Sequence, residues 1–277
     1  DGPPSPEPGV PMGRYLSLLY GGLAYLVFLA VFLYAVAFVG DFAVPRTVDA
    51  GPSASVGTAL LVDAVLLLLF DSGVSTGLAE ALLVDVGLLL LFAVQHSVMA
   101  RDWFKERWTR VVPEHLERST YVLFASLVLA LIFWQWRPIP GTVWSVEGPG
   151  ASVLWGLFGL GWAIVLVSTF LIDHFDLFGL RQVWSHFRGE VYEPPEFQEP
   201  ALYRYVRHPL YLGFLLAFWA IPEMTVGHLL FAAATTGYIL VAIRFEESDL
   251  LRYHGEQYAR YRERVPMLIP RPWGRRE

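Results

Sequence analysis

Twenty-two consecutive residues decide the fold: LAEALLVDVGLLLLFAVQHSVM, residues Leu78–Met99. A helix needs about 20 mainly apolar residues to cross the hydrocarbon core of a bilayer. The apolar residues show no period-two alternation, so the segment satisfies its backbone groups as a helix rather than as a barrel strand. The stretch therefore predicts a membrane-spanning α-helix.

Other apolar stretches of similar length lie on both sides of this one. Of the 277 residues, 55% are hydrophobic and only 17% are charged, against about 25% charged in an ordinary soluble domain. We predict an all-α polytopic membrane protein with about five to six transmembrane helices and a cytoplasmic C-terminal helical segment. The further expected spans are Tyr15–Val39, Thr120–Trp136, Val153–Ile172 and Leu210–Ile243, the last broken at Pro222 into a helical hairpin.

Basic residues predict the orientation. Residues 101–118 contain five lysines and arginines, residues 173–208 and the tail after Ile243 contain several arginines, and residues 138–149 contain none. Cytoplasmic loops carry the excess of Lys and Arg. We therefore expect the basic segments and the active site to face the cytoplasm, with the protein in the inner membrane of a bacterium.

Residues 51–70 and 73–92 form a short tandem repeat, and both copies contain Leu-Leu-Val-Asp and a Leu-Leu-Leu-Leu-Phe run. The apolar part of the first copy is short for a span, so we interpret it as a re-entrant or interfacial helix. Asp63 and Asp85 occupy matching positions. A carboxylate at membrane depth is a functional hypothesis by default, but since the repeat copied it, a structural role is favoured for Asp63.

Domain organisation is simple. Residues 1–13 begin with a segment rich in Pro and Gly, which predicts a disordered tail, and residues 14–277 read as one integral-membrane domain. The chain has no cysteine, which excludes disulfides, thiolate metal sites and Cys nucleophiles.

The C-terminal third contains the most informative motifs. Arg207-His208-Pro209 opens the broken hairpin, and Pro209 suits the first position of a helix, whose positive end favours a carboxylate. A basic interfacial anchor is the alternative. Glu246-Glu247 ends the hairpin, and carboxylates there need a partner, either an arginine or a cationic ligand. The residues His254, Tyr258, Tyr261 and Val265 share one helix face.

These motifs, together with Tyr211, Gly213, Gly255 and Pro266, resemble the membrane methyltransferase superfamily that includes isoprenylcysteine carboxyl methyltransferases and phospholipid methyltransferases. The resemblance covers residues 202–270 and implies that this part binds S-adenosylmethionine. The cofactor-site residues that it implies are Arg207, His208, Tyr211, Gly213, Glu246, Glu247 and Tyr258.

Motifs nearer the N-terminus narrow the resemblance. Gln95-His96-Ser97, Glu117-Arg118-Ser119-Thr120-Tyr121, Trp134-Gln135-Trp136-Arg137-Pro138 and Asp173-His174-Phe175-Asp176 look like the bacterial methanethiol S-methyltransferase group, which is related to NnrU-type membrane proteins. The resemblance implies S-methylation of a small thiol, methanethiol, to dimethyl sulfide. The alternatives are a methyltransferase acting on a lipid or a prenylated cysteine, and a non-enzymatic NnrU-type protein.

Methylation of a thiol needs its thiolate, so a base must assist near neutral pH. His174 with Asp176 as its orienting partner is the preferred pair, and Arg181 could hold a carboxylate of the cofactor. Each residue also has a structural interpretation: His174 could cap a helix at the membrane interface, and Arg181 could contact a lipid headgroup. His96 is a third candidate, although a bond between helices is the commoner role of such a residue. A metal site built from His96, His174, His186 and His208 has no supporting motif spacing, so we expect none; the sequence leaves the oligomeric state open.

Overall fold

The structure is a computed structural model that describes residues 11–50 and 77–270. Most of the expected tail, the first repeat copy and Asp63 lie outside the described residues. The first helix begins at Met12, so Met12 and Gly13, which we assigned to the tail, are helical.

Five described helices are long and apolar enough to cross a membrane, which confirms the all-α membrane fold. The helix over Leu78–Met99 begins and ends at the residues expected. The other helices begin up to six residues earlier than expected, α5 ends one residue before Trp136, and α10 continues well beyond Ile243 to Arg264. The five are α1 (Met12–Gly40), α3 (Leu78–Met99), α5 (Glu114–Gln135), α6 (Pro149–Ile172) and α10 (Val226–Arg264), and the shorter apolar α9 covers Pro209–Trp219.

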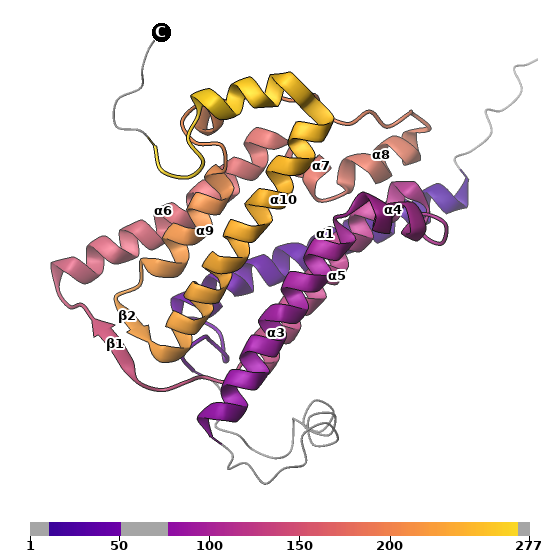
Figure 1. Ribbon diagram of the computed structural model, residues 1–277. Helices are drawn as coiled ribbons and strands as arrows, with labels where there is room; N and C mark the ends of the chain where they lie inside the picture. Colours follow the sequence, from indigo (N-terminus) through magenta and orange to yellow (C-terminus); the bar gives the residue numbers. More distant parts are fainter. Residues whose placement is uncertain (1–10, 51–76, 271–277) are drawn as a thin grey trace, which may run out of the picture.

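The expected break at Pro222 is present. The chain leaves α9, forms strand β2 (Glu223–Thr225) and enters α10, so the two helices form a hairpin. Strand β1 (Thr142–Ser145) pairs antiparallel with β2 and joins this hairpin to the connection between α5 and α6 (Figure 1). The small ribbon closes the bundle at one end.

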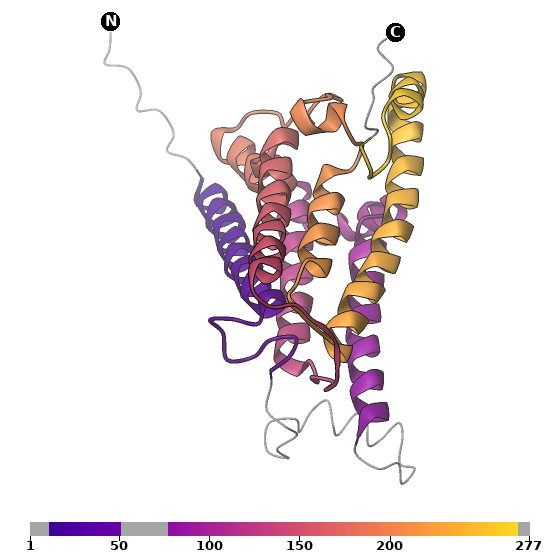
Figure 2. The ribbon, with the colours of Figure 1, turned by 90° about the vertical axis from the view of Figure 1, so that its left-hand side faces the viewer.

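The helices run side by side between the two ends of the molecule (Figure 2). Helix α6 packs along α9, α1 packs along α5, and α3 contacts both α5 and α10. The approach of α6 and α9 is close because Gly161 and Gly213 face each other: a Cβ on Gly213 would lie 2.7 Å from the carbonyl oxygen of Gly161. Small residues permit such contacts between membrane helices.

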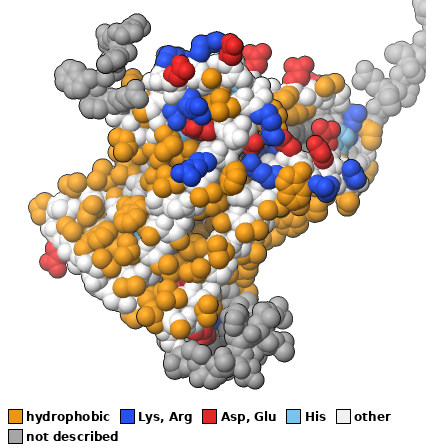
Figure 3. Space-filling view, in the orientation of Figure 1, with side chains coloured by type: hydrophobic (Ala, Val, Ile, Leu, Met, Phe, Trp, Pro, Cys, Tyr) orange, Lys and Arg blue, Asp and Glu red, His pale blue; other side chains and the backbone are white. Residues whose placement is uncertain are grey.

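Charged side chains gather at the end opposite the ribbon (Figure 3). This end contains the short helices α4 (Asp102–Trp108), α7 (His174–Leu177), α8 (Leu180–Arg188) and η1 (Ala201–Arg204), and the last turns of α10. The three basic segments 101–118, 173–208 and 244–264 thus meet at one end of the bundle, as their connection by spanning helices requires.

Asp85 has a structural role at the other end. Its side chain is fully buried in α3, and its Oδ1 accepts a hydrogen bond from the backbone N–H of Arg137, at 2.9 Å. The carboxylate therefore satisfies a backbone donor just beyond the end of α5.

Candidate functional site

A buried charge cluster joins the two C-terminal motifs. The side chain of Glu247, on α10, accepts hydrogen bonds from Arg207, with Nε at 2.8 Å and Nη2 at 2.7 Å. Nε2 of His208 lies 3.1 Å from the same carboxylate oxygen. His208 precedes α9, so the carboxylate that we expected near the start of that helix comes from the chain itself.

The segment after α10 folds back to complete this cluster. The backbone N–H groups of Arg207 and His208 donate to the carbonyls of Pro266 and Met267. The guanidinium of Arg207 also donates to the carbonyls of Arg262 and Val265. Because the last carbonyls of a helix lack partners within the helix and carry partial negative charge, the guanidinium caps α10 as well as pairing with Glu247.

The adjacent glutamates differ in their surroundings. The Glu247 side chain is 13% exposed and is neutralised by Arg207 and His208, whereas the Glu246 side chain is 44% exposed. Glu246 lies 3.8 Å from Nδ1 of His208 and interacts with the hydroxyl of Tyr211. Glu246 is therefore the carboxylate that is accessible to a ligand.

An aromatic cluster packs beside the charges. Phe197, in the segment between α8 and η1, contacts the rings of Tyr258, Tyr261 and His254 at centroid distances of 5.8, 5.5 and 5.1 Å. The expected single helix face holds for Tyr258 and Tyr261, whereas His254 lies before an interruption of the helix at Gly255 and reaches Phe197 from the other side of that bend. Tyr258 is 1% exposed, and among the described residues its hydroxyl has no hydrogen-bond partner.

Several known proteins are similar to this chain over most of its length. The family described as "Protein of unknown function (DUF1295)" matches residues 90–265. A protein of Mycobacterium tuberculosis named Methanethiol S-methyltransferase is 55% identical over 94% of this chain and 98% of its own length. This chain belongs to the methanethiol S-methyltransferase family.

Other relatives extend the comparison. A Methanethiol S-methyltransferase of Crocosphaera subtropica is 52% identical over 94% of this chain and 93% of its own. Nurim of Pan troglodytes is 33% identical over 60% of this chain. No solved structure matches the chain.

Among the residues that the family resemblance implies, Gly213 has a separate explanation. Its position faces Gly161 and Val165 of α6, where any side chain would meet backbone atoms. Its role is to set the distance between two helices. Of the other six residues, three form the charge cluster and three lie beside it: Arg207, His208 and Glu247, and Tyr211, Glu246 and Tyr258.

His174 is buried at the junction of α6 and α7. Its Nε2 lies 2.8 Å from the hydroxyl of Tyr25 on α1, and its Nδ1 lies 2.8 Å from Oγ1 of Thr169. Its ring stacks on Phe170 at 4.2 Å. Burial lowers the pKa of His174, opposed in part by the charge of Asp173, so the ring is neutral at pH 7. Both ring nitrogens already have hydroxyl partners, so a thiol would have to displace one of these hydroxyls to reach His174.

The partners expected for His174 and Arg181 are arranged differently. Oδ1 of Asp176 accepts from the hydroxyl of Tyr192 at 2.7 Å and from Gln182, so in the structure Asp176 does not orient His174. Arg181 pairs with Asp173 at 2.8 Å. A surface cavity of about 640 Å³ opens beside this group, and its lining includes His174, Arg181, Glu193 and Glu196.

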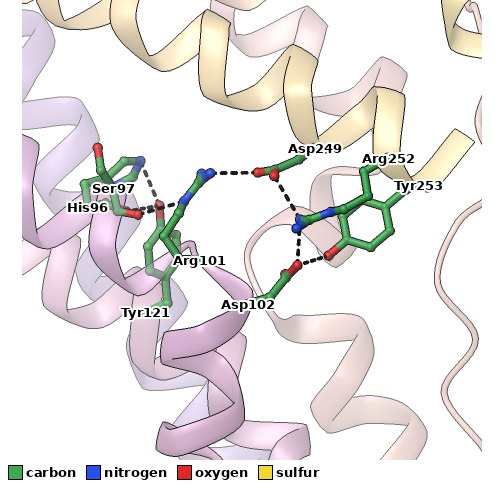
Figure 4. Close-up of polar contacts among 8 residues, drawn as sticks. All are labelled: His96, Ser97, Arg101, Asp102, Tyr121, Asp249, Arg252 and Tyr253. Atoms are coloured by element: carbon green, nitrogen blue, oxygen red, sulfur yellow. Dashed lines mark hydrogen bonds and ion pairs between the residues drawn. The ribbon is translucent and has the colours of Figure 1, made fainter. Parts of the chain in front are cut away.

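His96 lies in a third polar group, where α3, α5 and α10 converge (Figure 4). Its Nε2 is 2.8 Å from the hydroxyl of Tyr121. Just beyond the end of α3, Arg101 pairs with Asp249 at 2.8 Å and joins the corner between α3 and α4 to α10. In the same figure Arg252 bridges Asp249 and Asp102, and Tyr253 also donates to Asp102.

The histidines considered for a metal lie in different surroundings, and His186 stacks on His115 at 3.5 Å. Within residues 11–50 and 77–270, no group of three His, Asp or Glu side chains could hold a metal ion. Sequence reasoning missed Tyr25, Thr169, Tyr192, Tyr238 and Asp249. Tyrosines and threonines in apolar helices are too common to be singled out without coordinates.

Proposed function

We propose that this protein transfers a methyl group from S-adenosylmethionine to methanethiol and so produces dimethyl sulfide. One observation carries the proposal: the Mycobacterium tuberculosis relative named for this activity is 55% identical and is matched over 98% of its length. Such coverage includes both the C-terminal motifs and the helices at the front of the chain.

The residues around the charge cluster fit S-adenosylmethionine. When bound, this molecule supplies a methyl group activated by a sulfonium. Glu246 presents an accessible carboxylate for its hydroxyl or ammonium groups. The buried hydroxyl of Tyr258 lacks a partner within the described residues and can bond a polar atom of a ligand, and the Phe197 ring offers an aromatic surface near it.

Glu247, Arg207 and His208 support that site without being free for a ligand. Their mutual pairing fixes the start of α9 against the end of α10. This arrangement holds Tyr211 and Glu246 on adjacent helices, and positioning of reacting groups supplies much of the rate in a displacement at carbon.

We also propose that the protein lies in the inner membrane of a bacterium with its basic end in the cytoplasm. The gathering of the arginine-rich segments at one end supports this orientation. S-adenosylmethionine, which is charged and polar, would then reach the charge cluster from the aqueous side.

The test uses detergent-purified protein, methyl-labelled S-adenosylmethionine and methanethiol, with detection of labelled dimethyl sulfide in the headspace. We expect labelled product that requires both substrates. Cofactor binding without this product would redirect the proposal to a lipid or prenylated-cysteine acceptor. A folded protein with neither binding nor product would favour a non-enzymatic role.

A further inference from the structure

His96 lies among aromatic rings contributed by three helices. On α3 it stacks on Phe92 at 5.0 Å, and it contacts Tyr121 of α5 at 5.0 Å and Tyr238 of α10 at 6.5 Å. The hydroxyl of Tyr238 also lies 3.4 Å from Oγ of Ser97. The imidazole is thus surrounded mainly by apolar ring surface within the membrane domain.

Tyr121 contacts His96 at two points. Its hydroxyl lies 3.4 Å from the backbone carbonyl of His96 and 2.8 Å from Nε2 of the ring. We assign the single ring proton of the neutral imidazole to Nε2, so that the phenol accepts there and donates to the carbonyl; this tautomer has its lone pair on Nδ1.

Nδ1 of His96 has no hydrogen-bond partner among the described residues, although the atom is buried. A buried polar atom without a partner costs about 1–3 kcal/mol, so a donor is expected there when the site is in use. The aromatic walls favour a small apolar molecule over water. A short alkanethiol combines one weak S–H donor with an apolar body.

One tyrosine links this group electrostatically to the proposed cofactor site. The hydroxyl of Tyr211, on α9, interacts with Glu246 and also with the hydroxyls of Tyr238 and Tyr121, which belong to the His96 group. By contrast, both ring nitrogens of His174 already have hydroxyl partners.

We propose that His96 is the catalytic base, whose Nδ1 takes the proton of the acceptor thiol; this inference rests on the proposed function. The S–H bond breaks as the N–H bond forms. The sulfur electron pair then makes the new bond to the methyl carbon, and the pair of the breaking carbon–sulfur bond stays on the leaving sulfur. The imidazolium keeps its Nε2–H bond to Tyr121 and later releases one proton.

The charged groups near His96 come from α5, from the corner between α3 and α4, and from α10. Arg118 on α5 lies over the Tyr121 ring, with its guanidinium carbon 5.1 Å from the centroid. Arg101, between α3 and α4, is neutralised by Asp249 of α10. The Arg118 charge opposes a stable imidazolium, which favours a base that is neutral at rest and returns its proton readily.

The experiment compares wild-type protein with His96→Gln and with His174→Gln, which replaces the competing candidate base; a pH-dependent loss confined to His174→Gln would overturn the proposal. For methanethiol, kcat/KM is measured from pH 6.5 to 9.5, and the Kd of S-adenosylmethionine is measured for each variant. We expect His96→Gln to lower kcat/KM at pH 7 by about 100-fold or more, with an unchanged Kd. The deficit should narrow as pH rises, since solution then supplies the thiolate.

A second measurement uses unmutated protein. Diethyl pyrocarbonate modifies unprotonated imidazole nitrogens, and peptide mass analysis locates the adduct. We expect modification of His96 that methanethiol suppresses, even without the cofactor. Three results would each overturn the proposal. The activity lost in His96→Gln could be the same at every pH, or His96→Gln could keep kcat/KM within about threefold of wild type at pH 7. In the second experiment, methanethiol could leave the modification of His96 unchanged. If wild-type protein forms no dimethyl sulfide, the proposed function itself fails.

Discussion

Glu246 and Glu247 are neighbours in the chain, yet only one of them is available to a ligand. Successive residues on a helix point in directions about 100° apart, so Glu247 faces Arg207 and His208 while Glu246 is 44% exposed. A ligand charge at Glu247 would compete with Arg207, whereas Glu246 can accept from a ligand directly. The two carboxylates therefore divide structural and binding roles.

Replacing each glutamate by glutamine separates these roles. Glu247→Gln breaks a mostly buried ion pair, which costs about 3–5 kcal/mol of stability in such sites, so the Tm in detergent should fall clearly. Glu246→Gln should leave Tm nearly unchanged and weaken S-adenosylmethionine binding by about tenfold, the loss of one charged hydrogen bond. Calorimetry measures the Kd of S-adenosylmethionine, and thermal unfolding measures the Tm. If Glu247→Gln kept its Tm but bound S-adenosylmethionine weakly, Glu247 rather than Glu246 would be the binding residue.

His174 predicts an acid limit to stability. Burial lowers its pKa in the folded protein, whereas the unfolded chain has the ordinary value of about 6.5. Below about pH 6.5 the unfolded state binds more protons, so stability falls as pH decreases towards the folded pKa and is fully retained above pH 6.5. The Tm should decline less between pH 7 and 5 in His174→Gln. Parallel declines in the two proteins would remove His174 from the effect.

At the scale of elements, two glycines act differently. Gly213 lets α9 approach the backbone of α6, while Gly255 bends α10 through a left-handed conformation with φ of 51°. The bend turns the last part of α10, with Tyr258 and Tyr261, towards Phe197 and the start of α9. After the bend, the carbonyls of Arg262 and Val265 accept hydrogen bonds from Arg207, the same residue that pairs with Glu247 before the bend.

Gly213→Ala should loosen the α6–α9 contact. The added Cβ would lie 2.7 Å from the carbonyl oxygen of Gly161 and 2.8 Å from the backbone nitrogen of Val165, and forced packing of this kind costs about 1–3 kcal/mol. The matched control is Gly237→Ala in α10, where no atom lies within 4 Å of the new Cβ. Thermal unfolding in detergent compares them; equal Tm values would show that the two helices separate without cost.

At the scale of the whole molecule, charge divides the bundle into two ends. One end gathers the basic segments and the three polar groups of Glu247, His174 and His96, and the other is closed by β1 and β2. The apolar surface between them is exposed in the isolated molecule, as expected for helices facing lipid. All candidate chemistry is thus accessible from one side of the membrane.

Cysteine labelling tests which side this is. Because the chain has no cysteine, single substitutions need no altered background. Ser145→Cys in β1 should react with a membrane-impermeant maleimide in intact bacterial cells, and Val191→Cys, 87% exposed at the basic end, should react only after permeabilisation. The opposite pattern would invert the proposed orientation.

The sequence alone determined the spans, the break at Pro222 and the shared face of Tyr258 and Tyr261, because apolar length, proline and periodicity are local properties. The sequence also predicted Arg207 and Glu246-Glu247 as cofactor-site residues, but only through the family resemblance. Only the tertiary structure decided which glutamate is paired, that Tyr25 and Thr169 contact His174, and that Nδ1 of His96 has no hydrogen-bond partner within residues 11–50 and 77–270. These contacts join residues on different helices, and their geometry depends on packing of the whole bundle.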